Sequence, residues 1–401
     1  MSPLHAASAN VVTDWDEKAV AFIQPRMVPP VAYRALAIMH IAMFEAVNSI
    51  EPRYQPYKAQ LPAAPDASKD AAAAAAAGAV LTKLLPDAAS DIQAALTSYL
   101  AAIPESGAKA NGIKLGDAAA TKILEARAND GSSTPDDYRP VTTPGVYIPT
   151  PPTVAPHWPN VAPFAMTSPS QFRPKPPIAL ESEQWGKDYN EIKELGEKNS
   201  SKRSARQTED ARFWLMTGPR STHPLNRQIP IQKEMSVIDS ARFMAVIAAA
   251  EADSMIAVFD AKYKYGFWRP ITAIRNGDID GNASTERDAT WQPLDNTPMH
   301  PEYPCAHCIV SSAAASAIEA MLGTADIPEV AMTSTTASGV THRWTNLHVY
   351  ADEVAAARIA SGFHYRFSIV VGQDMGRQIG ANTVKTIMQP LAQTSGSGGA
   401  R

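Results

Sequence analysis

The sequence predicts an all-α fold, a large helical bundle interrupted by two long irregular loops. Apolar and alanine-rich residues recur at helical spacing through most of the chain, as in AAAAAAAGAV at 71–80. Alanine favours helix because it loses no side-chain entropy there. The 33 prolines indicate long irregular connections as well, and no convincing set of strands appears. The 401 residues suffice for one large domain or two, and we expect a single helical domain over 1–401.

The N-terminal half, about residues 11–130, shows helical periodicity. In VAYRALAIMHIAMFEAVNSI (31–50), apolar residues lie three or four apart behind a Pro-Pro start, which the first turn of a helix tolerates. Further helices are predicted at 69–85, 87–103 and 112–130. Pro86 separates the first two of these, and an Asp-Gly pair ends the last.

Residues 131–177 form the first irregular loop. Prolines recur there at short intervals, and helical runs are few. Loops of this length are usually either a functional wall or a linker. Because Tyr147, Trp158 and Phe164 offer apolar surface for packing, we interpret this loop as a belt across the body of the protein and not as a free hinge.

The C-terminal half, residues 178–390, returns to helical periodicity. Helices are predicted at 181–216, 228–265, 305–322, 347–361 and 364–388. Residues 276–303 are rich in Asp, Asn, Gly and Thr and form the second irregular loop. The glycine- and serine-rich residues 391–401 are interpreted as a flexible tail.

Composition excludes two classes of partner. A formal net charge of -4 leaves no basic excess for nucleic acid or for a membrane surface. No stretch indicates a membrane span, because Glu251 and Asp253 interrupt the most apolar segment, 245–259. The first residues lack a basic region followed by an apolar one, so the chain is either cytosolic or has had a leader removed.

Both cysteines of the chain and two of its histidines lie within HPEYPCAHC (300–308). Zinc binding is disfavoured here, because structural zinc sites usually draw ligand pairs from two separated segments. Dithiol redox chemistry is disfavoured too, although Cys305 and Cys308 have the C-x-x-C spacing, because such motifs open a helix beside a βαβ sheet. A disulfide between the two cysteines stays open.

A third interpretation of this cluster is an anion site. A helix of small residues follows Pro304, and the first N–H groups of a helix lack intrahelical acceptors. They point outward at the positive end of the helix dipole, where anions bind readily. His307, in the first turn, would stand at the edge of such a site.

Three cationic residues elsewhere match an anion of high charge. Lys262 lies seven residues before Arg269, so both share one face of a helix. Arg358 lies six residues before His364, which would place them about 120 degrees apart on one continuous helix. We therefore expect a break at Gly362, which would allow both side chains to face one compact oxyanion. Arginine suits this task because its planar fork binds pairs of oxygens.

These blocks resemble, in the same order, the signature of the vanadium-dependent haloperoxidases and type 2 phosphatidic acid phosphatases. That signature is K-x6-RP, then PSGH, then SR-x5-H. Here it reads Lys262-x6-Arg269-Pro270, then Pro304-Cys305-Ala306-His307, then Ala357-Arg358-x5-His364. HPEYPCAHC and the early segment 29–57 also look like the soluble bacterial haloperoxidase-like branch. Three spaced motifs in order are a specific signal.

The resemblance implies the α-helical bundle of this superfamily, with vanadate, or phosphate as its analogue, as the bound group. Lys262, Arg269 and Arg358 would neutralise the oxygens of the oxyanion. His364 would be the axial ligand to vanadium or, in a phosphatase, the nucleophile that takes the phosphoryl group, and His307 would be the acid–base residue. A peroxidase of this kind uses hydrogen peroxide and halide, whereas the phosphatase hydrolyses a small phosphoester through a phosphohistidine.

Three positions refine or depart from the family pattern. His300 lies where bromoperoxidases of the family carry a second histidine, which favours bromide or iodide over chloride. Cys305 replaces a serine that donates to the oxyanion, and a thiol is a weaker donor that peroxide can oxidise. Ala306 replaces a glycine, and its methyl group narrows the approach to the helix start. A phosphatase, or an oxyanion-binding homologue with weakened catalysis, are the alternatives.

Residues outside the motifs receive plainer interpretations. His40, His342 and His348 are interpreted as structural, and Trp214, Trp268 and Trp344 as core or pocket wall. Phe259 is placed on the halide side of the pocket as a hypothesis. The resemblance favours a periplasmic or secreted location. A homodimer is the candidate assembly, since paired helical bundles often dimerise.

Overall fold

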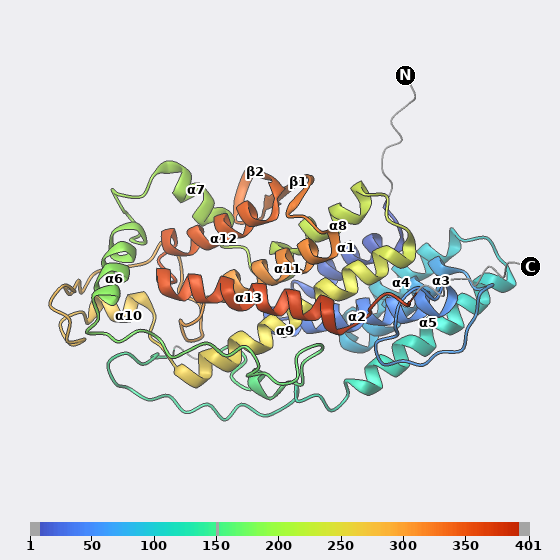
Figure 1. Cartoon of the computed structure of the whole chain (residues 1–401), viewed down its shortest axis with the longest axis horizontal. Helices are drawn as coiled ribbons and strands as arrows, with labels where there is room; N and C mark the ends of the chain where they lie inside the picture. Colours follow the sequence, from blue (N-terminus) through green and yellow to red (C-terminus); the bar gives the residue numbers. More distant parts are fainter. Residues whose placement is uncertain (1–8, 150–151, 393–401) are drawn as a thin grey trace, which may run out of the picture.

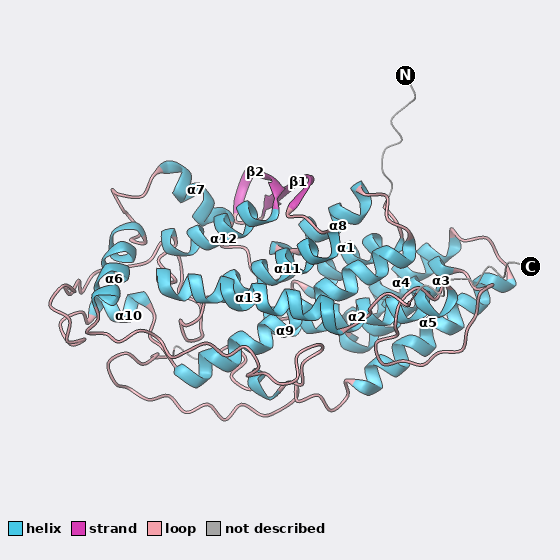
Figure 2. Cartoon of the chain, viewed as in Figure 1, coloured by secondary structure: helices cyan, strands magenta, loops and turns pink. Residues whose placement is uncertain are grey.

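The computed structural model describes residues 9–149 and 152–392, and within them the protein is helical apart from one β-hairpin (Figure 1, Figure 2). The all-α prediction is therefore confirmed. The helices are α1 (Val11–Ile23), α2 (Pro29–Ile50), α3 (Lys69–Leu84), α4 (Ala89–Ala101), α5 (Gly107–Ala126), α6 (Glu183–Leu195), α7 (Ala205–Phe213), α8 (His223–Gln232), α9 (Val237–Tyr265), α10 (Pro270–Arg275), α11 (Ala306–Leu322), α12 (Leu347–Ala360) and α13 (Arg366–Thr386). Short 3-10 turns are η1 (Pro86–Ala88), η2 (Trp158–Asn160) and η3 (Gly218–Ser221).

Side-chain caps explain where several predicted helix boundaries were wrong. The helix expected at 112–130 is α5, which begins five residues earlier because the Ser106 hydroxyl accepts the N–H of Lys109 at 3.1 Å. The helix expected at 181–216 is two helices, α6 and α7. The second starts behind Ser204, whose side chain and that of Gln207 form a capping box.

The prediction that no strands are present was wrong. Antiparallel strands β1 (Asp326–Ser334) and β2 (Ala337–Asn346) form a hairpin against the C-terminal half (Figure 2). Val330 pairs with Trp344 and Met332 with His342, and all four side chains are buried. Buried and exposed residues alternate over only a short segment of each strand, and a pattern of that length does not predict a strand reliably.

The C-terminal half is organised around α11 and α13, which pack along each other (Figure 1). Gly376 and Gly380 of α13 face the backbone of α11. A Cβ at these positions would lie 2.3 and 2.4 Å from the carbonyl oxygens of Ile309 and Ala313. Glycine therefore permits a close backbone approach, which fixes the relative position of the two helices and of their starts.

The predicted belt is confirmed for the described part of residues 131–177. This segment runs along one side of the helices as an irregular chain with a single 3-10 turn in its described residues, and Tyr147, Trp158 and Phe164 are buried (Figure 1). The Asp253 carboxylate on α9 accepts three successive N–H groups of the belt, from residues 164–166, at 2.6–2.8 Å. Most residues predicted as the flexible tail, 393–401, lie outside the described residues.

Within residues 9–149 and 152–392, one helix is long and apolar enough to cross a membrane, which the sequence interpretation did not anticipate. It is α2, and 94% of its most apolar window is buried inside the protein. The bent pair formed by α3 with residues 86–101 passes the same test only when taken together. The burial of α2 is that of a core helix, since it packs against α3, α5 and α9.

A buried charge network joins the N-terminal helices to α8 and α9. The Asp16 carboxylate lies 2.9 Å from His40 Nε2 and 2.5 Å from His223 Nδ1, and His223 Nε2 lies 2.9 Å from the Glu251 carboxylate. Burial lowers the pKa of His223, but Asp16 and Glu251 outweigh it and raise the pKa to about 10. His223 is thus an imidazolium held between two carboxylates at neutral pH.

This network predicts how stability depends on pH. The folded-state pKa of His223 is about 10, above the ordinary 6.5, so its contribution is complete below pH 6.5 and is lost as pH rises toward 10. We expect the free energy of unfolding, measured with urea, to fall over this range by up to about 1.4 kcal/mol per pH unit. The slope should be shallower in His223→Gln and unchanged in His348→Gln, whose side chain is exposed. Equal slopes in all three proteins would contradict the assignment.

Candidate functional site

Five helix ends meet at one end of the C-terminal half and carry the predicted residues. Lys262 lies in the last turn of α9, Arg269 caps α10, and His307 lies in the first turn of α11. Arg358 lies in the last turn of α12, and His364 precedes the start of α13 by two residues. The predicted break at 362 is confirmed: α12 ends at 360, and the intervening glycine has a φ of 77°.

Arg269 is the centre of the contacts. Its side chain is buried, and its Nε donates to the carbonyl oxygen of His300 at 2.8 Å. Nη1 donates to Phe363 O at 3.0 Å and lies 3.2 Å from His364 Nε2, while Nη2 lies 3.0 Å from His300 Nδ1. Since arginine only donates, both ring nitrogens that face it are acceptors.

Glu302 fixes the other side of the His364 ring. His364 Nδ1 lies 2.7 Å from Glu302 Oε1, and the same oxygen accepts the N–H of Tyr365 at 3.1 Å. The proton of the neutral ring therefore lies on Nδ1, and the lone pair lies on Nε2, toward Arg269. Burial raises the pKa of Glu302 to about 7, although Lys262 and Arg269 act in the opposite direction.

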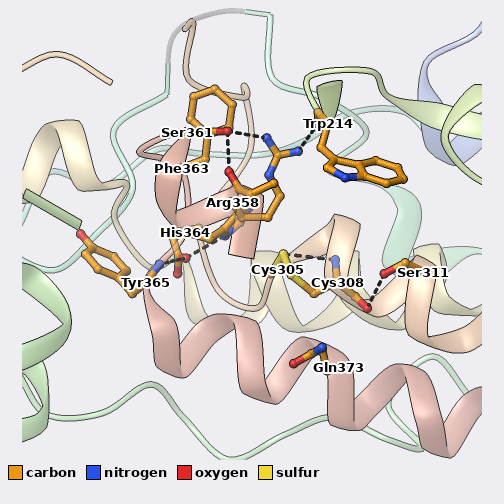
Figure 3. Close-up of a disulfide and its surroundings, with 12 residues drawn as sticks. Trp214, Cys305, Cys308, Ser311, Arg358, Ser361, Phe363, His364, Tyr365 and Gln373 are labelled. Atoms are coloured by element: carbon orange, nitrogen blue, oxygen red, sulfur yellow. Dashed lines mark hydrogen bonds and ion pairs between the residues drawn. A yellow bond between two sulfur atoms is a disulfide. The ribbon is translucent and has the colours of Figure 1, made fainter. Parts of the chain in front are cut away.

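Arg358 and His307 are both held by one irregular segment that follows α7. Arg358 Nη1 donates to the carbonyl oxygen of Trp214 at 2.5 Å, and Nη2 donates to Ser361 Oγ at 3.1 Å (Figure 3). His307 Nε2 lies 3.2 Å from the carbonyl oxygen of Met216 and so carries the proton of the neutral ring. The segment 214–216 thus positions a guanidinium and an imidazole through backbone oxygens.

Lys262 is fully buried, and its ammonium donates to the carbonyl oxygens of Pro301 and Glu302, both at 2.7 Å. These two bonds hold the segment before α11 in place. One of the three ammonium protons remains beyond these bonds. Burial first, and then the charge of Arg269, lower the pKa of Lys262 well below its ordinary value.

Cys305 and Ala306, both expected to contact the oxyanion, differ in position: Ala306 lines the cavity described below, and Cys305 is absent from its described lining. Cys305 forms a disulfide with Cys308, and its Sγ accepts the N–H of Cys308 at 3.2 Å (Figure 3). The disulfide, which the sequence left open, means that the bridged sulfur has no S–H to donate. The N–H groups of Ala306 and His307, in the first turn of α11, have no intrahelical acceptors.

A cavity of about 1330 Å³ opens onto this set of residues. Arg269, Arg358, His300, His307, His364 and Ala306 line it, whereas the lining within the described residues does not include Lys262 or Cys305. The cavity lining also includes the apolar residues Met255, Val310 and Phe259. The Phe259 ring lies 5.3 Å from that of His300, beside the residue with which the halide hypothesis placed it.

The charges around the cavity are unbalanced. The cationic side chains of Lys262, Arg269 and Arg358 are almost completely buried. Among the described residues, Glu302 contributes a carboxylate to this group through its hydrogen bond with His364. Burial and Arg269 lower the pKa of Arg358 to about 9. Buried Arg358 Nε also has no hydrogen-bond partner among the described residues. Because unpaired buried charge is costly, this arrangement fits a multiply charged anion.

The histidines remain neutral in the absence of such an anion. Burial and Arg358 lower the pKa of His307 to about 3. Burial, together with neighbouring cations, also lowers the pKa of His300 and of His364 well below the ordinary value. A neutral His364 has a lone pair available for a metal centre or an electrophilic phosphorus atom.

Sequence reasoning missed two contributors to this site. Glu302 lies within HPEYPCAHC, and a glutamate beside a predicted anion site was a signal that we did not use. The backbone oxygens of Trp214 and Met216 leave no trace in residue type, so only the structure reveals them. Trp214, Trp268 and Trp344 are buried and lie outside the cavity lining of the described residues, which places them in the core.

The segment that carries all three motif blocks matches a known family model. Residues 242–393 match the model of the second helical-bundle domain of vanadium chloroperoxidase (VCPO). A curated relative, vanadium chloroperoxidase from Curvularia inaequalis, is 28% identical over 141 residues, which are 29% of this chain and 22% of that protein. The chain thus matches about a fifth of the length of that relative.

Solved structures share the fold over almost the whole chain. A bacterial vanadium-dependent iodoperoxidase superposes with a TM-score of 0.79 at 24% identity, covering 94% of this chain and 96% of that one. The holo form of a bacterial vanadium-dependent chloroperoxidase gives 0.73 at 17% identity, covering 95% and 98%. Its apo-type counterpart gives 0.74 at 16% identity, covering 89% and 93%. At these identities the likeness establishes the fold.

Proposed function

We propose that the chain is a vanadate-dependent haloperoxidase, because residues 242–393 match the model of the second helical-bundle domain of vanadium chloroperoxidase and the fold is that of bacterial vanadium haloperoxidases. It oxidises halide with hydrogen peroxide. The observation that carries the proposal is the cavity in which Arg269, Arg358 and His364 converge without a balancing anion. Vanadate fits this donor set, since it is a compact oxyanion that also accepts a nitrogen ligand.

The residues that line the cavity have different roles in this proposal. Arg269 and Arg358 donate to the oxygens of the bound oxyanion, the latter through an Nε that otherwise has no partner. His364 Nε2, which lies 3.2 Å from Arg269 Nη1, would be the ligand that holds vanadium. His307 exchanges a proton at Nδ1, because its Nε2 is hydrogen-bonded to the carbonyl oxygen of Met216.

In this proposal Lys262 acts on the bound oxyanion indirectly. Two of its N–H groups are bound to carbonyl oxygens, so it supplies charge and holds the segment that bears Glu302. Cys305, being bridged, leaves the N–H groups of Ala306 and His307 as the donors from the start of α11. Bound vanadate would supply a Lewis-acidic centre for peroxide activation without a change of its oxidation state.

Halide preference is assigned to the side of the cavity that holds His300. Its ring lies 3.0 Å from Arg269 Nη2 and 5.3 Å from the centroid of Phe259. A histidine here favours bromide or iodide in the family pattern, and one relative of the same fold is an iodoperoxidase. We therefore expect iodide and bromide to be oxidised faster than chloride.

An acid phosphatase is the alternative function. The same observation supports it: His364 has Nδ1 bound to Glu302 and a lone pair on Nε2, as a nucleophile toward phosphorus requires. The arginines would then stabilise the transferring phosphoryl group, and His307 would protonate the leaving oxygen. Vanadate distinguishes the two functions, because it activates the peroxidase and inhibits the phosphatase.

The test compares both activities on one preparation. Protein dialysed against vanadate is given hydrogen peroxide with iodide, bromide or chloride, and halogenation of a dye is followed. A parallel sample is given nitrophenyl phosphate with and without vanadate. We expect vanadate-dependent halogenation with iodide and bromide, above that of the same vanadate without protein.

The other outcomes decide against the peroxidase. Release of nitrophenol that vanadate inhibits, without halogenation, would assign the chain to the phosphatases. Silence in both assays, while phosphate still binds, would make it an oxyanion-binding homologue with weakened catalysis. Vanadium analysis of the dialysed protein, set against the concentration of the chain, checks the first expectation directly.

A further inference from the structure

His342 on β2 presents a buried ring nitrogen that has no partner. Its side chain is 1% exposed, and Nε2 makes no hydrogen bond among the described residues. The ring is stacked on Phe213 of α7, with centroids 4.0 Å apart. Because buried polar atoms in proteins are almost always paired, this nitrogen calls for an explanation.

The opposite nitrogen of the ring fixes which atom carries the proton. His342 Nδ1 lies 2.6 Å from Glu353 Oε1. The Glu353 carboxylate also accepts the indole N–H groups of Trp214 and Trp344, at 3.0 and 3.2 Å. A carboxylate with three ring N–H donors is held as an acceptor, so the proton of the neutral imidazole lies on Nδ1. The lone pair of Nε2 then points away from Glu353.

Two carboxylates of α7 face that lone pair. His342 Nε2 lies 3.8 Å from Glu209 Oε1 and 3.7 Å from Asp210 Oδ1. These separations are too long for hydrogen bonds. They are close to the spacing of two ligand atoms that each lie about 2.0–2.2 Å from one zinc ion. The three candidate ligand atoms lie within 4.8 Å of one another.

The other histidine–carboxylate cluster of the protein behaves differently. In that cluster Asp16 lies 2.9 and 2.5 Å from the ring nitrogens of His40 and His223. Those are hydrogen-bond distances, and they leave no room for an ion between the atoms. In the Asp16 cluster the carboxylate is hydrogen-bonded directly to both rings, whereas His342 Nε2 and the two carboxylates of α7 are separated by more than a hydrogen-bond distance.

We propose that Glu209, Asp210 and His342 bind a divalent transition-metal ion, zinc by the chemistry of the donors. One imidazole and two carboxylates match the ligands that zinc takes, and a hard ion such as Mg²⁺ would not favour the imidazole. The Glu353–His342 pair is the carboxylate–histidine arrangement that commonly orients a metal-bound imidazole. The sequence had offered no motif for His342, which was interpreted there as structural.

Arg206 holds the carboxylates when no metal is bound. Its guanidinium lies 3.1 Å from Glu209 Oε1 and 2.9 Å from Asp210 Oδ1, and the side chain is 61% exposed. An exposed arginine can move into solvent at little energetic cost, since surface ion pairs contribute little to stability. Arg206 is therefore a competitor for the carboxylates and not part of the metal site.

A metal here would brace the segment that holds the cavity residues. Glu209 and Asp210 are on α7, and that helix ends directly before Trp214 and Met216, whose carbonyl oxygens bind Arg358 and His307. His342 is on the hairpin, and Ser334 Oγ already donates to Phe213 O at 2.7 Å. Thr336 Oγ1 also donates to Arg212 O at 2.8 Å, and the ion would add a further connection between the hairpin and α7, away from the catalytic residues.

The experiment measures zinc binding to the whole chain after chelator treatment. Titration calorimetry and metal analysis are applied to the wild type, to the double variant Glu209→Gln/Asp210→Asn and to the matched variant Arg206→Gln. We expect the double variant to bind one zinc ion fewer per chain than the wild type. Arg206→Gln should keep that site and bind zinc at least as tightly, because it loses the competing cation.

Thermal unfolding and cobalt provide independent readouts. Zinc should raise the melting temperature of the wild type by about 2 °C or more at saturation, and leave that of the double variant unchanged. Cobalt should give visible absorption bands that the double variant lacks. The proposal is overturned if the three proteins bind zinc with equal stoichiometry, or if none of them binds it. Both ligand carboxylates are partly exposed, so the double variant is expected to fold.

Discussion

Replacing His364 with alanine is expected to lower vanadate-dependent halogenation at least about 100-fold, which is about 2.7 kcal/mol of lost transition-state stabilisation. The variant loses the nitrogen whose lone pair faces the cavity, while Arg269, Arg358 and Lys262 stay in place. Those cations should still bind an oxyanion. We therefore expect phosphate affinity, measured by calorimetry, to fall less than about tenfold while activity is lost.

The split between binding and activity makes this prediction specific. His348→Ala, on α12, serves as the matched control, because its ring is 59% exposed and pairs with Glu319 at the surface. It should keep both phosphate affinity and activity. Full halogenation activity in His364→Ala would contradict the assignment of this nitrogen as the vanadium ligand, whatever the phosphate data show.

Replacing Glu302 is expected to have the second largest effect. In Glu302→Ala the Nδ1–H of His364 loses its acceptor at 2.7 Å, and the ring is free to change tautomer and orientation. Partners of metal-bound histidines typically contribute 10–100-fold, so we expect kcat to fall by about that factor. Glu302→Gln should lie between, because its amide oxygen can still accept from both His364 Nδ1 and the N–H of Tyr365.

The gradation from glutamate to glutamine to alanine separates positioning from general instability. Vanadium content and kcat should fall in that order, whereas the melting temperatures of the glutamine and wild-type proteins should be similar. If Glu302→Gln were as impaired as Glu302→Ala, the negative charge and not the hydrogen bond would be the contribution of this residue. If neither variant lost activity, Glu302 would have no role in the site.

Helix existence was predictable from the sequence, because long apolar periodicity dominates segments such as 31–50 and 237–265. Helix boundaries were less predictable, because they depend on single capping side chains such as Ser106 and Ser204. The hairpin at 326–346 was missed because its buried positions alternate over only a few residues. Local patterns of that length do not distinguish a strand from an irregular segment.

The candidate site, like the fold, was predictable only in part. Spacing and resemblance identified Arg269, Arg358 and His364, and the structure brings these three together. The state of Cys305 was open in the sequence, because a C-x-x-C spacing permits a bridge without requiring it. The orientation of the histidines could not be predicted, since it depends on Glu302 and on the Met216 carbonyl oxygen, which reach the rings only after folding.

The contact of α11 with α13 also has a consequence for redesign. Gly376 and Gly380 allow α13 to approach the backbone of α11 closely, so the relative position of the two helices depends on main-chain contact. Attempts to reshape the substrate range would do better at Phe259 and Met255, whose apolar side chains line the same cavity. Directed evolution should leave the contact between α11 and α13 unchanged.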